Sequence, residues 1–103
     1  MSIREELEDK LGEIPGLARQ RSRFGHAHSF FVGSREIAHF HGDGRMDVRL
    51  TREWIRTAKA EGTLDPRVRT RGSSADWATV PLQRRRDVTL ALILIEEAMR
   101  ANA

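Results

Sequence analysis

Polar and apolar residues alternate along most of the stretch between residues 26 and 50, with the period of two that is typical of β-strands. Gly33-Ser34 interrupts this stretch and predicts a two-residue hairpin turn, because a type II′ turn requires glycine at its first central position. A turn at these two residues places Phe30 opposite Ile37 and His28 opposite His39. All four histidines of the chain are then predicted to share one face of the sheet, namely His26, His28, His39 and His41.

Gly42-Asp43-Gly44 predicts a second hairpin, with a three-residue loop and Gly44 in the left-handed conformation. This loop places His39 opposite Asp47. A four-residue loop would leave both faces mixed, so the three-residue loop is favoured. One face then gathers apolar residues for a core, which are Phe31, Ala38, Phe40, Met46, Val48 and Leu50. The other face adds Arg45, Asp47, Arg49, Phe30 and Ile37 to the histidines, and Glu36 falls on the core face.

Capping signals and periodicity predict the remaining elements. Residues 2–12 form a helix that begins with a capping box of Ser2 and Glu5, and residues 17–24 form an edge strand. A second helix runs from its cap, Thr51, to about residue 60 and ends at Gly62. Residues 63–75 form a loop with a short extended piece, residues 76–82 a strand, and residues 88–101 a helix capped by Asp87.

These elements predict one domain, residues 1–103, of the α+β class. The predicted order is α-β-β-β-β-α-β-α, a two-layer sandwich with a mainly antiparallel sheet and helices on one face. In the strand over residues 76–82, alternate apolar residues suit the core, so Trp77 falls on the side of the histidines.

Composition excludes several classes of protein. The chain has no cysteine, which excludes disulfides, thiolate metal sites and cysteine nucleophiles. No apolar run approaches the roughly 20 residues of a membrane span, and we expect a cytoplasmic protein with no membrane partner. The net charge is +3, with arginine clusters at residues 19–23, 67–71 and 84–86. Nucleic-acid binding is not expected, because exposed aromatic residues do not accompany these clusters.

The helix over residues 88–101 is apolar around almost its whole circumference. A helix of this kind is normally covered on more than one side. With so few other elements in the chain, part of the cover is predicted to be a partner subunit, so we expect a homodimer through this helix.

The string REIAHFH, from Arg35 to His41, is followed by Asp47-Val48-Arg49-Leu50, the helix end at Gly62, Asp65-Pro66 and the Trp77 strand. Over about residues 30–101, this pattern resembles the luciferase-domain family. The family comprises fungal luciferases, which oxidise a hydroxylated hispidin with molecular oxygen, and many short bacterial proteins. The resemblance implies the fold and the importance of His39 and His41.

The sequence departs from the family pattern at two positions. Asp65 stands where relatives are expected to carry histidine before proline, and Arg49 stands where the fungal enzymes carry another histidine. The resemblance therefore predicts a related site rather than light emission itself. It requires no cofactor.

The histidine pattern leaves two kinds of site open. Alternate residues of a strand project to one side, so the two side chains of a His-x-His pair can bind one cation. The first kind of site is therefore a divalent metal bound by His39 and His41, with His28 and His26 as further candidate ligands. Asp47 could orient such a ligand or complete a 2-His-1-carboxylate iron site. Alternatively, His39 or His41 would deprotonate an enolic substrate without a cofactor, with Arg49 or Arg45 holding the developing enolate.

The predicted ligand is a small aromatic or enolic molecule, seated on an apolar surface that includes Phe30, Ile37 and Trp77, with His28 also in contact. The alternative is a non-catalytic ligand-binding or interaction module on the same scaffold. A solvated histidine face is the simpler interpretation for His26 and His28, which lie outside the string that carries the resemblance.

Overall fold

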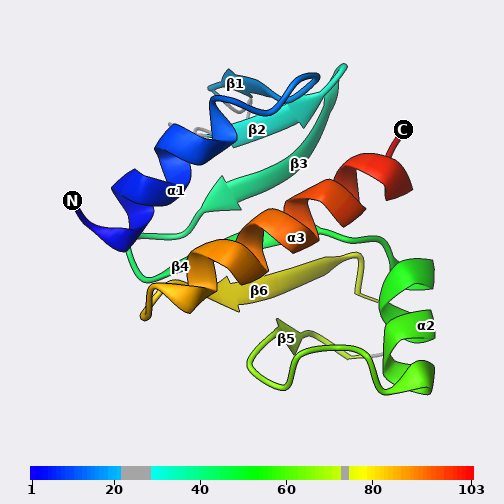
Figure 1. Cartoon of the computed structure of the whole chain (residues 1–103). Helices are drawn as coiled ribbons and strands as arrows, with labels where there is room; N and C mark the ends of the chain where they lie inside the picture. Colours follow the sequence, from blue (N-terminus) through cyan, green and yellow to red (C-terminus); the bar gives the residue numbers. More distant parts are fainter. Residues whose placement is uncertain (22–28, 73–74) are drawn as a thin grey trace.

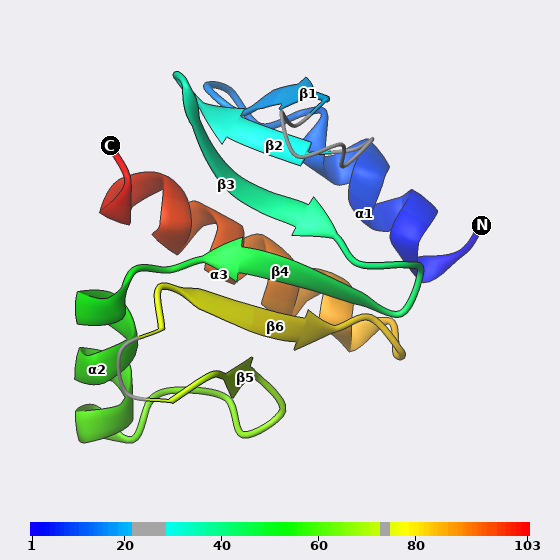
Figure 2. The same ribbon diagram turned by 180° about the vertical axis from the view of Figure 1, so that it is seen from behind.

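The computed structural model describes residues 1–21, 29–72 and 75–103, which form a six-stranded sheet with helices on one face (Figures 1 and 2). The helices are α1 (Ile3–Leu11), α2 (Arg52–Glu61) and α3 (Arg86–Ala101). The strands are β1 (Ala18–Gln20), β2 (Ser29–Val32), β3 (Arg35–Phe40), β4 (Arg45–Arg49), β5 (Arg69–Thr70) and β6 (Trp77–Pro81). The predicted α+β class is confirmed, and β5 is a short strand within the predicted loop.

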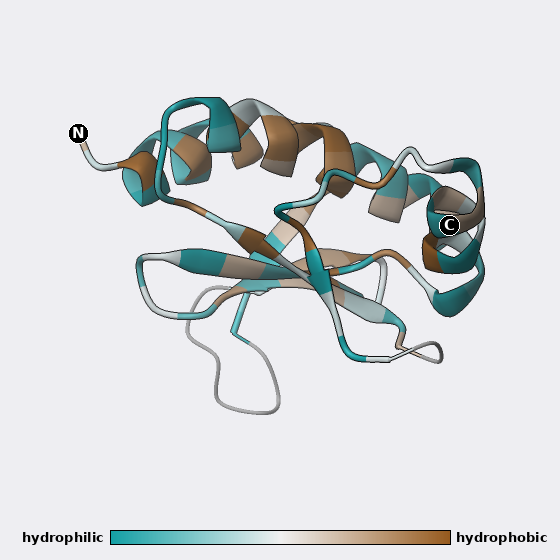
Figure 3. Cartoon of the chain, turned by 90° about the horizontal axis from the view of Figure 1, so that it is seen from below, coloured by the Kyte–Doolittle hydropathy of each residue, from teal (hydrophilic) through white to brown (hydrophobic). Residues whose placement is uncertain are grey.

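The strand order in the sheet is β1-β2-β3-β4-β6-β5, and neighbouring strands are antiparallel. Helix α3 crosses β3, β4 and β6 on one face, and α1 packs beside α3. Figure 3 shows the helices as one layer above the sheet, and Figure 2 shows α2 beyond the end of the sheet. Among the described residues, no helix covers the opposite face of the sheet, which we call the open face.

The helix ends follow the predicted capping signals at α1 and α2. Ser2 and Glu5 form the predicted capping box, and Thr51 accepts the first-turn N–H of Trp54. Gly62 ends α2 with a φ of 69°, in the left-handed region that glycine adopts without steric cost.

The start of α3 differs from the prediction, because Asp87 lies inside the first turn and is not the cap. Its buried carboxylate accepts the backbone N–H groups of Gln83 and Arg84 and pairs with Arg67. Burial alone would raise the pKa of Asp87, but these donors lower it below its ordinary value. Asp87 therefore ties the β6–α3 loop and the segment before β5 to the helix.

The core lies between the sheet and the helices, and it is built from alternate strand residues and the inner faces of α1 and α3. Its largest fully buried members are Phe30, Leu7, Leu11, Ile37, Met46, Leu50 and Ile95. Ala78, Val80 and Leu82 are buried as predicted, which leaves Trp77 and Thr79 on the open face.

The β3–β4 hairpin has the predicted register. Ala38 pairs with Val48, His39 with Asp47, and Phe40 with Met46. The N–H of His41 donates to the carbonyl of Arg45, which leaves the predicted three-residue loop. The left-handed residue is Gly42, with a φ of 69°, and not Gly44.

The β2–β3 register is where the prediction is wrong. The turn at Gly33-Ser34 forms, but Phe31 pairs with Glu36 and Phe30 pairs with Ala38. Ile37 is therefore the extra residue of a β-bulge, and Ile37 and Ala38 are both buried although they are consecutive. Phe30 and Ile37 thus belong to the core, and Phe31 and Glu36 belong to the open face.

The predicted edge strand is confirmed for residues 18–20, which pair with β2. His26 and His28 lie outside the described residues, so their predicted pairing with β3 stays a prediction. Among the described residues, no helix is both long enough and apolar enough to cross a bilayer.

Replacing Ile37 with alanine tests the bulged register. We expect Ile37→Ala to lower the free energy of unfolding by about 2–5 kcal/mol, because it deletes a fully buried side chain. Ile93 on α3 is 53% exposed, so Ile93→Ala is the matched control, with an expected change of about 0.5 kcal/mol. Urea unfolding measures both, and equal, small effects would contradict the buried position of Ile37.

Candidate functional site

Neighbouring strands bring several polar and aromatic side chains together on the open face. His39 extends from β3, Asp47 lies opposite it on β4, and Trp77 and Thr79 come from β6, which pairs with β4. These three strands are central in the sheet, so their backbone positions are fixed by hydrogen bonds on both sides.

His39 is held between two carboxylates. Its Nδ1 is 2.9 Å from Glu36 Oε1, and its Nε2 is 3.1 Å from Asp47 Oδ2. The side chain of His39 is only 12% exposed. Because each bond needs an N–H donor on the ring, both form together only when the imidazole is protonated. The arrangement therefore favours the imidazolium form of His39.

The bulge at Ile37 creates the contact between Glu36 and His39. In a regular strand, residues three apart project to opposite faces. The extra residue restores Glu36 to the face of His39, so the two side chains meet within one strand. Glu36 was predicted on the core face, and the structure corrects that position.

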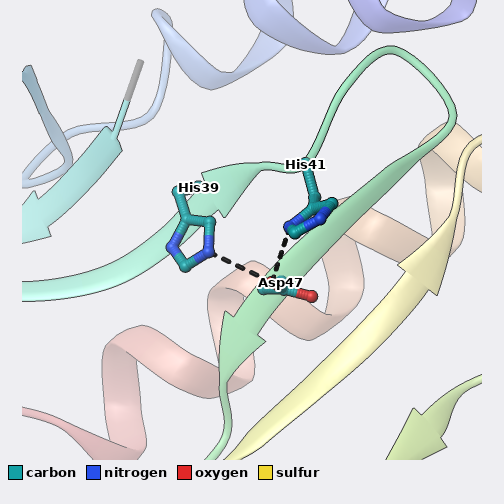
Figure 4. Close-up of side chains that lie close together, drawn as sticks. All are labelled: His39, His41 and Asp47. Atoms are coloured by element: carbon teal, nitrogen blue, oxygen red, sulfur yellow. Dashed lines mark hydrogen bonds and ion pairs between the residues drawn. The ribbon is translucent and has the colours of Figure 1, made fainter. Parts of the chain in front are cut away.

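Asp47 connects three side chains. Thr79 Oγ1 donates to Asp47 Oδ1 over 2.7 Å, and the other oxygen, Oδ2, faces His39. His41 Nδ1 lies 3.6 Å from the same Oδ2 atom, and the side chain of His41 is 55% exposed. Figure 4 shows the two imidazoles on either side of Asp47. The predicted association of His39, His41 and Asp47 is thus present in the structure.

Electrostatics of the cluster shift two pKa values in opposite directions. Burial lowers the pKa of His39, but the hydrogen bonds and charges of Asp47 and Glu36 outweigh it and raise the pKa above its ordinary value. The hydrogen bond from His39 lowers the pKa of Asp47, and the bond from Thr79 adds to this effect, against the opposing effect of burial. The pair is therefore most favourable as imidazolium and carboxylate.

A shallow pocket of about 670 Å³ adjoins His39. Two of its lining residues contact that histidine: Glu36 by the hydrogen bond, and Trp77 with ring centroids 5.1 Å apart. Phe31 adds a second aromatic side chain to the wall. The pocket is also lined by Gln20, Arg21, Ser34, Arg35 and Arg49. Its volume lies in the range of small-molecule sites.

Arg49 lines this pocket and is held in place by two partners. Its Nη1 donates to Asn102 Oδ1 over 2.6 Å, and its Nη2 is 3.7 Å from Asp76 Oδ2. Asp76 also accepts the N–H of Arg52 at the start of α2. Arg45 lines a different hollow, of about 350 Å³, with Arg67 and Arg69.

The structure brings together five of the predicted site residues: His39, His41, Asp47, Arg49 and Trp77. Phe30 and Ile37 are buried beneath the sheet and have no surface for a ligand, so that part of the prediction is wrong. His28 and His26 lie outside the described residues.

Sequence reasoning missed Glu36, Phe31 and Thr79 as members of the site. A signal for the first two exists in the sequence. A regular strand places the charged Glu36 in the core and Ile37, the next residue, on the solvent face. A bulge removes this conflict, because it lets both Ile37 and Ala38 enter the core. Thr79 needed knowledge of the strand order, because β6 follows α2 and β5 in the chain but pairs with β4.

The cluster also has the composition of a cation site. One ligand atom from each of His39, His41 and Asp47 lies within 4.8 Å of the others. Two imidazole nitrogens and one carboxylate oxygen are ligands that suit divalent transition metals.

The raised pKa of His39 predicts how stability depends on pH in metal-free protein. The contribution of the pair needs ionised Asp47, so it is lost below about pH 4, and it is fully present up to about pH 6.5, the unfolded value for histidine. It is then lost as the pH rises through the raised pKa of folded His39. Urea unfolding at about pH 6 and about pH 9 should show a larger loss for the wild type than for His39→Gln. Equal losses would contradict the shift.

Comparison with known proteins identifies the family. A search of curated proteins and a search of solved structures gave no match. A family model described as a luciferase domain matches residues 34–98, which is more than half of the chain and includes β3, β4, β6 and most of α3. His39, His41, Asp47 and Trp77 all fall within the matched range. The chain belongs to the luciferase-domain family.

Proposed function

We propose that this chain binds a small aromatic or enolic molecule in the pocket beside His39 and removes a proton from it. The observation that carries the proposal is the position of the pocket, whose wall includes both a partner of His39, Glu36, and two aromatic side chains, Phe31 and Trp77. Family membership supports the same chemistry, because its fungal luciferases oxidise an aromatic enol with molecular oxygen.

The two aromatic side chains of the pocket wall would form the surface against which a planar ligand packs. Trp77 is fixed against His39, and Phe31 is half-buried on β2. Burying one aromatic face of a ligand against such side chains contributes on the order of 1–2 kcal/mol. The ligand would thus lie between Phe31 on β2 and Trp77 on β6, next to Glu36 on β3.

Proton removal would use the hydrogen-bonded series of Glu36, His39 and Asp47. Glu36 lines the pocket, and His39 connects it to Asp47. An enol hydroxyl in the pocket can transfer its proton to the Glu36 carboxylate, and the positive charge of Arg49 in the pocket wall would stabilise the enolate. An enolate is the electron-rich form that reacts with oxygen.

Trp77 fluorescence provides the test. In a Trp54→Phe background Trp77 is the remaining tryptophan, so its emission reports on the pocket. Titration with a panel of hydroxylated pyrones and aromatic enols should change it saturably. Phe31→Ala should weaken binding roughly 5–30-fold, which corresponds to about 1–2 kcal/mol. Glu36→Gln should abolish proton removal, measured as the absorbance of the bound enolate.

Ile93→Ala is the control variant, because Ile93 lies on the helix layer on the other side of the sheet. Its binding curve should match that of the parent. The proposal fails if no compound in the panel changes the emission up to about 1 mM, or if Phe31→Ala binds as tightly as the parent.

A non-catalytic interaction module with a homodimer through α3 stays the alternative. The described residues give it a small surface: Met1 and Ile93 are their exposed large hydrophobic residues, and Leu90 and Leu92 are packed against the core. The expectation that nucleic acid is not a partner stays a prediction; Arg19 and Arg69 lie on opposite edge strands, β1 and β5.

A further inference from the structure

We propose that His39 Nε2, His41 Nδ1 and the Asp47 carboxylate bind one divalent transition-metal ion on the open face. This inference goes beyond the proposed function, because it concerns cation binding by the protein without substrate.

The spacing of the ligand atoms fits a shared ion. Metal–ligand distances near 2.1 Å place neighbouring ligand atoms about 3.0 Å apart in octahedral geometry and about 3.4 Å apart in tetrahedral geometry. Asp47 Oδ2 is 3.1 Å from His39 Nε2 and 3.6 Å from His41 Nδ1. Two of the three spacings thus match a shared ion, and one ligand atom from each of the three residues lies within 4.8 Å of the others.

Two further residues orient these ligands. A histidine that binds metal through one nitrogen usually donates its other N–H to a carboxylate or carbonyl, and Glu36 occupies that place at His39 Nδ1. Thr79 Oγ1 donates to Asp47 Oδ1, which leaves Oδ2 directed at both histidines. Histidine and aspartate side chains on a solvated sheet face do not need such orienting hydrogen bonds. The hydrogen bonds made by Glu36 and Thr79 therefore favour a preformed metal site.

Charge favours a divalent ion as well. The Glu36 and Asp47 carboxylates both lie beside His39, which is largely buried. Their negative charges attract a cation to this place, and a divalent ion more strongly than a monovalent one. Imidazole ligands favour Fe²⁺, Co²⁺ and Zn²⁺ over Mg²⁺ and Ca²⁺, which prefer oxygen ligands throughout.

The site leaves room for other ligands on the ion. His41 is more than half exposed, and three protein ligands leave coordination positions open. A bound ion would act there as a Lewis acid beside the pocket, while Glu36 and Trp77 keep their positions in the pocket wall.

Calorimetric titration of tag-free, chelator-treated protein with Zn²⁺, Co²⁺ and anaerobic Fe²⁺ tests the proposal. We expect one ion per chain. His41→Ala and Asp47→Asn should each weaken binding by at least about 100-fold, and Glu36→Gln by about 10–100-fold. His41 is exposed, so its replacement should leave the fold intact, which circular dichroism checks.

One control separates this site from adventitious binding. Asp43 lies in the same hairpin loop and its side chain is 92% exposed, so Asp43→Asn should bind the ions as the wild type does. Absence of binding by all three ions up to about 1 mM would overturn the proposal, as would binding that survives His41→Ala and Asp47→Asn. Neither result touches the fluorescence test of the aromatic pocket.

Discussion

The open face depends on the bulge that Ile37 introduces into β3. The extra residue lets two consecutive side chains, Ile37 and Ala38, enter the core, and it returns Glu36 to the side of His39. Both consequences have one cause, because a bulge reverses the alternation of faces along a strand. Without it, His39 would have a carboxylate at Nε2 alone, and Phe31 would lie under the sheet instead of in the pocket wall.

The same atoms of this cluster take part in both of its states, protonated and, as proposed, metal-bound. In the protonated state, His39 neutralises part of the charge of Glu36 and Asp47, and in the proposed metal-bound state a divalent ion replaces its Nε2 proton. Asp47 holds its orientation in both states, because Thr79 binds its other oxygen. The fold therefore holds these side chains in their arrangement before any ligand binds.

The sequence predicted the layers, most element bounds and the β3–β4 register, because these follow from short-range signals. Gly62 ends α2 because glycine adopts the left-handed conformation that this helix end requires. The three-residue loop at Gly42-Asp43-Gly44 sets the register that places His39 opposite Asp47. The candidate residues His39, His41 and Asp47 followed from that register, and Trp77 followed from the alternation along residues 76–82.

What escaped prediction depends on packing across the sheet. A regular strand ladder extended from the turn at Gly33-Ser34 places Phe30 and Ile37 on the open face. Burying these two side chains stabilises the fold more than a regular pairing of β2 with β3 would, so the strand forms a bulge. The start of α3 moved for a similar reason, because Asp87 has partners in the chain segments before β5 and after β6. These partners lie in loops, and loops have no periodic pattern of apolar residues from which their contacts could be predicted.

The most direct test of this account is a ¹⁵N NMR titration of the histidine rings in tag-free, chelator-treated protein. His39 should titrate with a midpoint above the ordinary value of about 6.5, with both ring nitrogens protonated below that midpoint, because Glu36 and Asp47 each accept one of its N–H groups. A His39 ring that titrates at or below about 6.5 would contradict the placement of Glu36 and with it the bulged register that assembles the site.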